Sequence, residues 1–142
     1  MTKEFSPEEY QQWLSEQPKK FIVVKVIMHS DQGNVLIQKP TYKKSWQLPG
    51  GGVDAGEDLK DALVREVSEE LGITIDKQAL QISGTIHKIP DDILFVVYHY
   101  TIHLPEDTAF VLPAEELEGY EFVSTEVATE RLAPLYSKLL KK

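Results

Sequence analysis

Apolar and polar residues follow two kinds of pattern along this chain, and the patterns predict both strands and helices. Runs rich in β-branched and aromatic residues are typical of strands, whereas apolar residues that repeat at intervals of three and four are typical of helices. The predicted strands cover residues 21–29, 35–39, 79–87, 93–104 and 120–123. The predicted helices cover residues 6–17, residues 58–71 and a segment that starts after Ser124 and is interrupted at Pro134. Because strands and helices do not alternate regularly, this order favours an α+β or α/β sandwich over a doubly wound sheet.

The first predicted helix has the strongest start signal. Ser6 suits the N-cap, Pro7 the first helical position, and Glu9 completes a capping box. The helix is expected to end before Pro18, which gives the range 6–17.

The predicted helix over residues 58–71 carries its charges in an unusual place. On a helical wheel, Glu66 and Glu70 fall within about 60° of Leu63, on the apolar face, and Glu69 lies farther round. Carboxylates three and four residues apart repel one another, and a carboxylate at the rim of a buried face is costly unless it is paired or metal-bound. The pattern therefore predicts that Glu66 and Glu70 point into a partly enclosed site, with Glu69 alongside, and that a hard divalent cation binds there.

The same residues allow plainer interpretations. The glutamates also fit a solvated, charged helix face with Arg65 and Lys60 as partners, since surface charge runs are common. Glu57, just before the helix, is explained equally well by its favourable interaction with the helix dipole.

A run of glycines, Gly50, Gly51 and Gly52, precedes this helix. Glycine permits positive φ and a close approach of the backbone to a neighbour. A glycine loop that leads into a helix can present a backbone carbonyl to a metal or backbone N–H groups to a phosphate.

Composition narrows the class of protein. The 142 residues show no internal repeat or long linker, so we expect a single domain over residues 1–142. Cysteine is absent, which excludes disulfides and thiolate metal sites and fits a reducing cytoplasm, so a cytoplasmic location is expected. The first ten residues do not resemble a secretory signal, and the longest apolar runs, near 21–28 and 93–98, are too short to span a bilayer.

The formal net charge of −8 concerns the choice of partner. Proteins that bind duplex nucleic acid normally present a basic face to the phosphates, so this charge argues against such a role. It does not argue against a small phosphorylated substrate, because bound cations can invert the local field of an acidic site.

Residues 51–73, GGVDAGEDLKDALVREVSEELGI, resemble the Nudix box, the signature of the Nudix hydrolases, at every specified position. The approach to the box, residues 46–50 and 54–56, is also similar to that family, with Asp54 where glutamate is commoner. The resemblance implies an α/β/α sandwich around a mixed sheet. It also implies hydrolysis of a nucleoside diphosphate linked to another group X, with Mg²⁺ or Mn²⁺ as the cofactor.

The resemblance also implies roles for individual residues. Glu66 and Glu70 would be the main metal ligands, Glu69 a further ligand or a base, and the carbonyl of Gly50 would complete the metal shell. Arg65 would orient its neighbours, paired with Glu57 or Glu69. A base from a loop is an alternative to Glu69, and the candidates are Asp91, Asp92, Glu115, Glu116 and Glu118.

Four further residues are candidates for contacts with the substrate: Lys39, Lys44, Trp46 and Glu118. Lys39, Lys44 and their neighbour Lys43 suit substrate phosphates, although a solvated loop also accounts for them. Trp46 suits packing beside the glycine run at least as well as stacking on a base.

The marks of several Nudix subfamilies are missing. The glutamine of the PQGG approach in RNA pyrophosphohydrolases is replaced, because the chain reads Pro49-Gly50 there. The chain resembles the MutT-like members that cleave nucleoside triphosphates, so a (d)NTP pyrophosphohydrolase is the first hypothesis, with damaged nucleotides among the candidate substrates. A nucleotide-sugar or dinucleotide pyrophosphatase is the alternative, and a non-catalytic nucleotide sensor is the alternative of another class. A monomer or a homodimer is expected.

Overall fold

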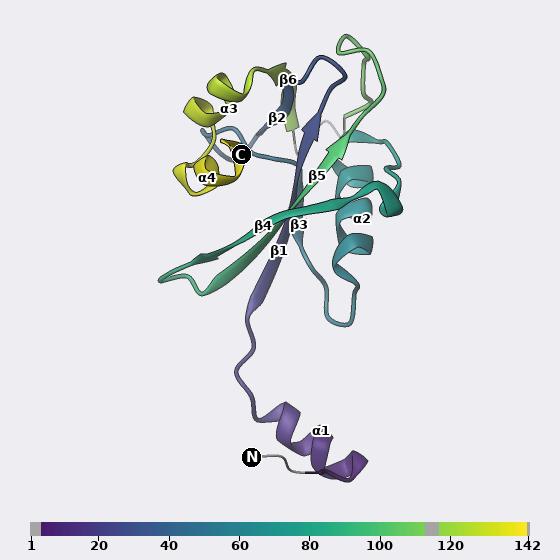
Figure 1. The fold of residues 1–142 in the computed structure, drawn as a ribbon, viewed down its shortest axis with the longest axis vertical. Helices are drawn as coiled ribbons and strands as arrows, with labels where there is room; N and C mark the ends of the chain where they lie inside the picture. The colour runs from purple at the N-terminus through teal and green to yellow at the C-terminus, as the bar shows by residue number, and fades with distance from the viewer. Residues whose placement is uncertain (1–3, 113–116, 142) are drawn as a thin grey trace.

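A computed structural model describes residues 4–112 and 117–141 of the chain (Figure 1). The strands are β1 (Phe21–His29), β2 (Val35–Pro40), β3 (Gly50–Gly52), β4 (Gln81–Lys88), β5 (Ile93–Thr101) and β6 (Leu117–Val123). The α-helices are α1 (Pro7–Ser15), α2 (Leu59–Leu71), α3 (Thr125–Arg131) and α4 (Ser137–Leu140). Short 3-10 helices, η1 (Lys77–Ala79) and η2 (Pro134–Tyr136), precede β4 and α4.

The strands form one mixed sheet in the order β4-β5-β1-β2-β6, and β3 pairs separately with β1. The central pair, β1 and β5, is parallel, and the other pairs are antiparallel. The central position of β1 places the residues of β3 against the middle of the sheet, where Lys25 is in register with Gly50.

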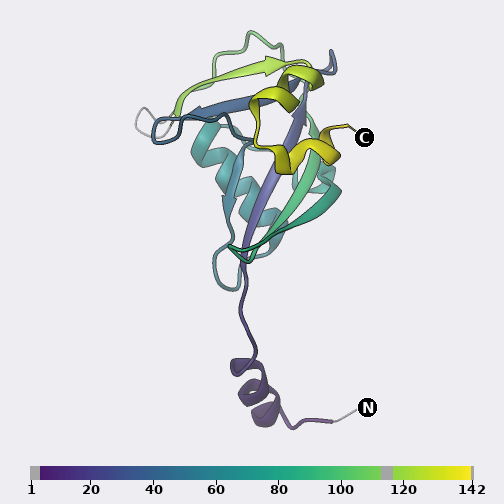
Figure 2. The same cartoon turned by 90° about the vertical axis from the view of Figure 1, so that its left-hand side faces the viewer.

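Helices cover both faces of the sheet, as an α/β/α sandwich requires, with α2 on one face and α3 and α4 on the other (Figures 1 and 2). Each face has its own apolar core. Alternate β1 residues such as Val24 and Val26 pack with Leu63 and Val67 of α2 in what we call the α2 core. Neighbouring β1 residues pack with residues of α3, η2 and α4 in the C-terminal core, which includes Val23, Ile27, Leu48, Ala128, Leu132, Tyr136 and Leu139. The predicted class of fold, a mixed sheet between helices, is confirmed.

Several predicted boundaries differ from those observed, and one strand was missed. The strand expected over 93–104 ends at Thr101, and the strand expected from 120 begins at Leu117. Residues Gly50–Gly52 were predicted as a loop that leads into the helix, because glycine permits positive φ and a close approach of the backbone. They form β3 because β1 offers a complete antiparallel partner, which propensity alone does not reveal.

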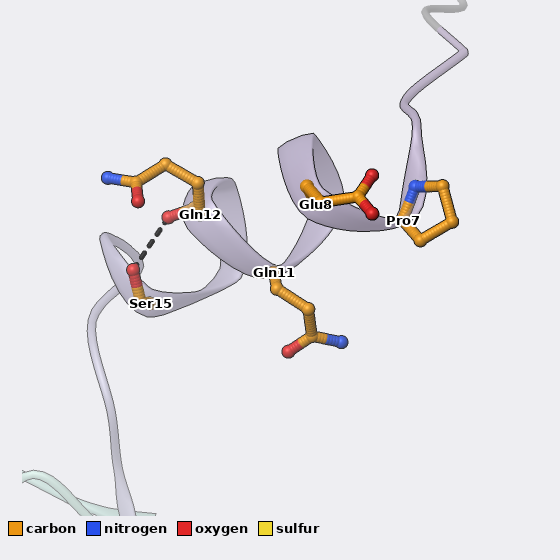
Figure 3. Close-up of a pocket in the computed structure, with 5 residues that line it drawn as sticks. All are labelled: Pro7, Glu8, Gln11, Gln12 and Ser15. Atoms are coloured by element: carbon orange, nitrogen blue, oxygen red, sulfur yellow. Dashed lines mark hydrogen bonds between the residues drawn. The ribbon is translucent and has the colours of Figure 1, made fainter.

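Helix α1 lies apart from the sandwich, joined to β1 by an extended segment (Figures 1 and 2). The predicted cap is present: the Ser6 hydroxyl accepts from the Glu9 N–H, and the Glu9 carboxylate accepts from the Ser6 N–H. The helix ends at Ser15, earlier than predicted, and none of its residues is buried. Figure 3 shows one side of this exposed helix, with the side chains of Pro7, Glu8, Gln11, Gln12 and Ser15. Among the described residues no helix is long and apolar enough to cross a membrane.

Candidate active site at the α2–β3 contact

Helix α2 is fixed at both ends and along one face. The Asp58 carboxylate accepts from the backbone N–H groups of Lys60 and Asp61 at the N-terminus, and Gly72 adopts the left-handed conformation that ends the helix. The buried face comprises Ala62, Leu63, Val67 and Leu71. The helical repeat then leaves Glu66 and Glu70 at the rim of this face, next to β3.

Glu70 is held against the glycine run by neutral donors. One carboxylate oxygen accepts from the Gly50 N–H at 2.8 Å, and the other accepts from the side-chain amide of Gln38. Burial raises the pKa of Glu70 to about 7, and the hydrogen bond from Gly50 offsets only part of that effect. Gln38, on β2, is itself buried, and its amide oxygen has no hydrogen-bond partner within the described part of the chain. Sequence analysis missed Gln38, whose only available signal was a polar residue within a predicted strand.

Glu66 lies directly over Gly51. A β-carbon added to Gly51 would lie 2.6 Å from the carboxyl carbon of Glu66, so only glycine leaves room for this side chain in its present position. Burial raises the pKa of Glu66 above its ordinary value, although a hydrogen bond from Arg65 opposes the shift. The glycine at position 51 is therefore required for space rather than for its backbone conformation.

Arg65 joins α2 to the loop between β3 and α2, residues 53–58, which we call the box loop. Its guanidinium donates to both oxygens of Glu57, at 2.8 and 2.9 Å, and to the carbonyl of Gly52 at 3.1 Å. It also donates to Glu66 at 3.0 Å and to Glu69 at 3.4 Å. These hydrogen bonds from Arg65 are the main reason that the pKa of Glu57 falls to about 2. Arg65 thus contacts both partners that the sequence offered as alternatives.

The donors at this site are oxygens, as a hard divalent cation requires. The carboxylates of Glu66 and Glu70 lie against Gly51 and the Gly50 N–H of β3, and the Gly50 carbonyl on the same strand is a further oxygen donor. The Gln38 side chain donates its amide to Glu70, and its amide oxygen is unpartnered among the described residues. Across residues 4–112 and 117–141, however, no three acidic or histidine side chains gather closely enough to hold a metal ion by themselves. Glu69, 55% exposed, is turned toward Arg65 instead. The oxygen donors present are therefore of the type that a divalent cation binds, and Glu69 is not among the carboxylates held against β3.

Lys25 is a charged residue at this site that the sequence analysis missed. It occupies a β1 position between Val23 and Ile27, two residues of the C-terminal core, and is only 9% exposed. Its ammonium donates to the carbonyls of Leu48, at 3.1 Å, and of Gly50, at 3.4 Å. Burial lowers its pKa below the ordinary value, and the negative charge of Glu70 opposes that shift. The available signal was a lysine inside an otherwise apolar strand.

The four candidate substrate contacts have different surroundings. Lys39 donates to the carbonyls of Pro40 and Lys43 and, at 3.4 Å, to Glu118, so it is engaged in holding its own loop. Lys44 is exposed. Trp46 packs against the C-terminal core, and the guanidinium of Arg131 lies 5.6 Å from the centre of its ring.

The candidate loop bases are also separated by the structure. Asp91 and Asp92 lie at the turn between β4 and β5, where Asp91 pairs with Lys88 and Asp92 pairs with Lys20. Glu118 lies on β6, next to the strand that carries Gln38. Glu115 and Glu116 lie outside the described residues.

Comparisons with known proteins agree with this geometry. A family model described as the NUDIX domain matches residues 19–142, which leaves out α1. The RNA pyrophosphohydrolase of Ruthia magnifica subsp. Calyptogena magnifica is 43% identical over 53 residues, 37% of this chain and 30% of that protein. The RNA pyrophosphohydrolase of Wolbachia pipientis subsp. Culex pipiens (strain wPip) is 32% identical over 88 residues, 61% of this chain and 54% of that protein. The matched segments thus span only 30% and 54% of the length of these two curated relatives.

A solved structure extends the likeness to most of the chain. The crystal structure of the MutT protein from Methanosarcina mazei Go1 has a TM-score of 0.70 and 23% sequence identity, and the match covers 88% of this chain and 94% of that one. At this identity the likeness concerns the fold.

Proposed function

Because the chain belongs to the Nudix family, we propose that it hydrolyses a pyrophosphate bond in a nucleoside diphosphate linked to X, with (d)NTPs as the preferred substrates. One observation carries the proposal: α2 brings the carboxylates of Glu66 and Glu70 against β3. The Gly50 carbonyl on that strand is the further oxygen donor that we propose for the cation. Two partly buried carboxylates with raised pKa values, held by few cationic partners, are suited to a divalent cation.

Mg²⁺ or Mn²⁺ at this position would neutralise phosphate charge and make a bound water more acidic. Glu66, Glu70 and the Gly50 carbonyl would hold the cation. Arg65 keeps the box loop against α2 through Glu57 and Gly52, which preserves the spacing between the carboxylates and β3. Within the described part of the chain, Glu69 has only the longer contacts with Arg65, at 3.4 Å, so it can turn to bind the cation or to remove a proton from water.

The substrate would approach from the side of the lysine-containing loop after β2. Since Lys39 is engaged with its own loop and with Glu118, the exposed Lys44 and Lys43 are the cations left for the terminal phosphates. The charge of Lys43 contributes to lowering the pKa of Lys25, which supports a role for Lys43 near the site. Glu118 is a better placed candidate base than Asp91 or Asp92, because β6 adjoins β2 and Gln38 of β2 contacts Glu70.

Free nucleotides are preferred over RNA in this proposal for two reasons. The net charge of −8 disfavours a long polyanion, and Gly50 stands where the approach in RNA pyrophosphohydrolases has glutamine. The names of the two curated relatives make 5′-triphosphorylated RNA the competing substrate.

A substrate panel tests the proposal. Purified protein with Mg²⁺ or Mn²⁺ is incubated with (d)NTPs, oxidised (d)NTPs, nucleotide sugars, dinucleoside polyphosphates and a 5′-triphosphorylated RNA oligonucleotide, and the products are separated by chromatography. We expect pyrophosphate or phosphate to be released most rapidly from a (d)NTP. Faster turnover of RNA or of a dinucleotide would reassign the substrate. Tight binding of a nucleotide without turnover would instead indicate a sensor.

Glu70→Gln tests the chemistry in the same assay. Loss of a charged metal ligand worth several kcal/mol in the transition state should lower turnover by roughly a thousandfold or more. Glu8→Gln on the exposed α1, outside the family match, is the control and should retain normal rates. Normal turnover by a folded Glu70→Gln protein would contradict the assigned role.

A further inference from the structure

Lys25 is a buried cation that the proposed reaction does not use. It lies on the central strand β1 and is 9% exposed, and the residues two positions before and after it, Val23 and Ile27, belong to the C-terminal core. The two oxygens it contacts are backbone carbonyls, and one of them, the Gly50 carbonyl, belongs to the group of atoms expected to bind the divalent cation. The Lys25 ammonium and the proposed divalent cation would therefore bind the same carbonyl oxygen.

The Gly50 carbonyl does not need Lys25 in order to stay in place. Gly50 is paired with β1 through the backbone, and its N–H is fixed by Glu70 at 2.8 Å. The preceding carbonyl, of Pro49, accepts from the Val26 N–H at 3.0 Å. The side chain of Lys25 adds charge to a peptide segment that is already held on both sides.

The two contacts of Lys25 are unequal. Its ammonium lies nearer to the Leu48 carbonyl, at 3.1 Å, than to the Gly50 carbonyl, at 3.4 Å. An ammonium has three donors, so it can release the Gly50 oxygen and keep the Leu48 oxygen. The charges of Glu70 and Glu66 both reach Lys25, so it also balances the carboxylates before a metal binds.

We propose that Lys25 is an internal competitor of the divalent cation: its ammonium engages the Gly50 carbonyl in the metal-free protein and weakens metal binding at the Glu66–Glu70 site. The inference rests on the proposed function, because it assumes that this site binds the metal. In physical terms, like charges repel, and the repulsion is stronger at a partly buried site than in water. Lys25 thereby sets the concentration of divalent cation at which the site fills.

Mn²⁺ titration of the full chain without nucleotide tests the inference, with free Mn²⁺ followed by electron paramagnetic resonance. Lys25→Met removes the charge and keeps much of the side-chain volume, so Mn²⁺ should bind at least roughly tenfold more tightly than to the wild type. Lys20→Met is the matched control, because Lys20 is an exposed lysine just before β1 that pairs with Asp92, and its affinity should stay within about twofold. Equal or weaker binding by folded Lys25→Met would overturn the inference, since a merely structural role predicts loss of affinity.

If Lys25→Met does not fold, the inference can be tested with Lys25→Gln and with the wild-type protein. The glutamine amide can still donate to the Leu48 carbonyl but carries no charge, so it too should bind Mn²⁺ more tightly. In the wild type, Mg²⁺ titration should move the NMR signals of the Lys25 ε-methylene group together with the Gly50 amide. Movement of Gly50 without Lys25 would refute the competition. Absence of metal binding in the wild type and in every variant would instead refute the proposed function.

Discussion

Glu57, just before α2, and Glu70, within α2, differ in the direction in which the protein shifts their pKa. Glu57 receives two hydrogen bonds from Arg65, and its pKa falls to about 2. Glu70 receives hydrogen bonds from an amide and a backbone N–H, both neutral, and burial raises its pKa to about 7. The residue type is the same and the two lie on the same short motif, so the difference comes from their partners and from their access to water.

The difference separates two tasks. The Arg65 side, comprising Glu57, Arg65 and Gly52, is satisfied by its own hydrogen bonds and holds the box loop to the helix. The Glu70 side, comprising Gly50, Gln38 and Glu70, leaves a carboxylate without an adjacent guanidinium. A divalent cation would therefore gain more from binding at the Glu70 side, whereas the Arg65 side supplies a fixed frame.

Gly50→Ala should have the largest effect on stability, because it disrupts the packing of β3 against β1 at the Glu70 side. The φ of Gly50 is +136°, and an added β-carbon would lie 2.0 Å from the backbone oxygen of Val24. Backbone strain and the clash together should cost at least about 3 kcal/mol of unfolding free energy. Gly56→Ala is the control, with φ +76° but open space around it, and should cost about 1 kcal/mol. Similar urea midpoints for the two variants would argue against the close contact of β3 with β1.

Arg65→Met breaks the other side and should have the next largest effect. The guanidinium is partly exposed and is bound to Glu57, Gly52 and Glu66, so its loss should cost about 1–2 kcal/mol in urea unfolding. Turnover should also fall, because the box loop loses its attachment to α2. Arg131→Met removes a more exposed guanidinium that pairs with Glu121 and should cost less than about 1 kcal/mol. Equal losses of unfolding free energy in the two variants would mean that the hydrogen bonds of Arg65 stabilise the fold no more than an exposed ion pair does.

The pH dependence of the metal-free protein sharpens the comparison. Because the folded-state pKa of Glu70 lies above its ordinary value of 4.5, the folded protein binds more protons than the unfolded protein between about pH 4.5 and pH 7. This group's contribution to stability therefore decreases as pH rises through that window. We expect the unfolding free energy, measured with urea in the presence of a chelator, to decrease less between pH 4.5 and pH 7 for Glu70→Gln than for the wild type. Identical slopes would contradict the raised pKa.

Gly51→Ala should have the smallest effect on stability and a clear effect on the site. Its β-carbon would meet the flexible end of Glu66 rather than backbone, so unfolding free energy should change by less than about 1 kcal/mol. The displaced Glu66 carboxylate should lower Mn²⁺ affinity by about tenfold. Gly119→Ala, on β6, is the control: no described atom lies within 4 Å of the added β-carbon, so both quantities should stay unchanged. Unaltered Mn²⁺ binding by Gly51→Ala would remove Glu66 from the metal site.

Local chemistry explains which elements were predicted well. The capping box at Ser6 acts over a few residues, so the start of α1 could be located from the neighbouring residues, whereas its end was predicted two residues too late. The apolar repeat of α2 likewise predicted that Glu66 and Glu70 lie at the rim of the buried face. The strand at Gly50–Gly52 was missed because its stabilising partner, β1, lies some twenty residues or more earlier in the chain.

The sequence by itself determined the box helix, its buried face and the group of carboxylates beside a glycine run, because spacing along one helix fixes which side chains share a face. Only the tertiary structure decided which neutral donors hold Glu70, that Glu69 turns to Arg65, and that Lys25 reaches the Gly50 carbonyl. Gln38 and Lys25 come from strands distant in sequence, and strand pairing with burial, rather than local propensity, brings them to the site.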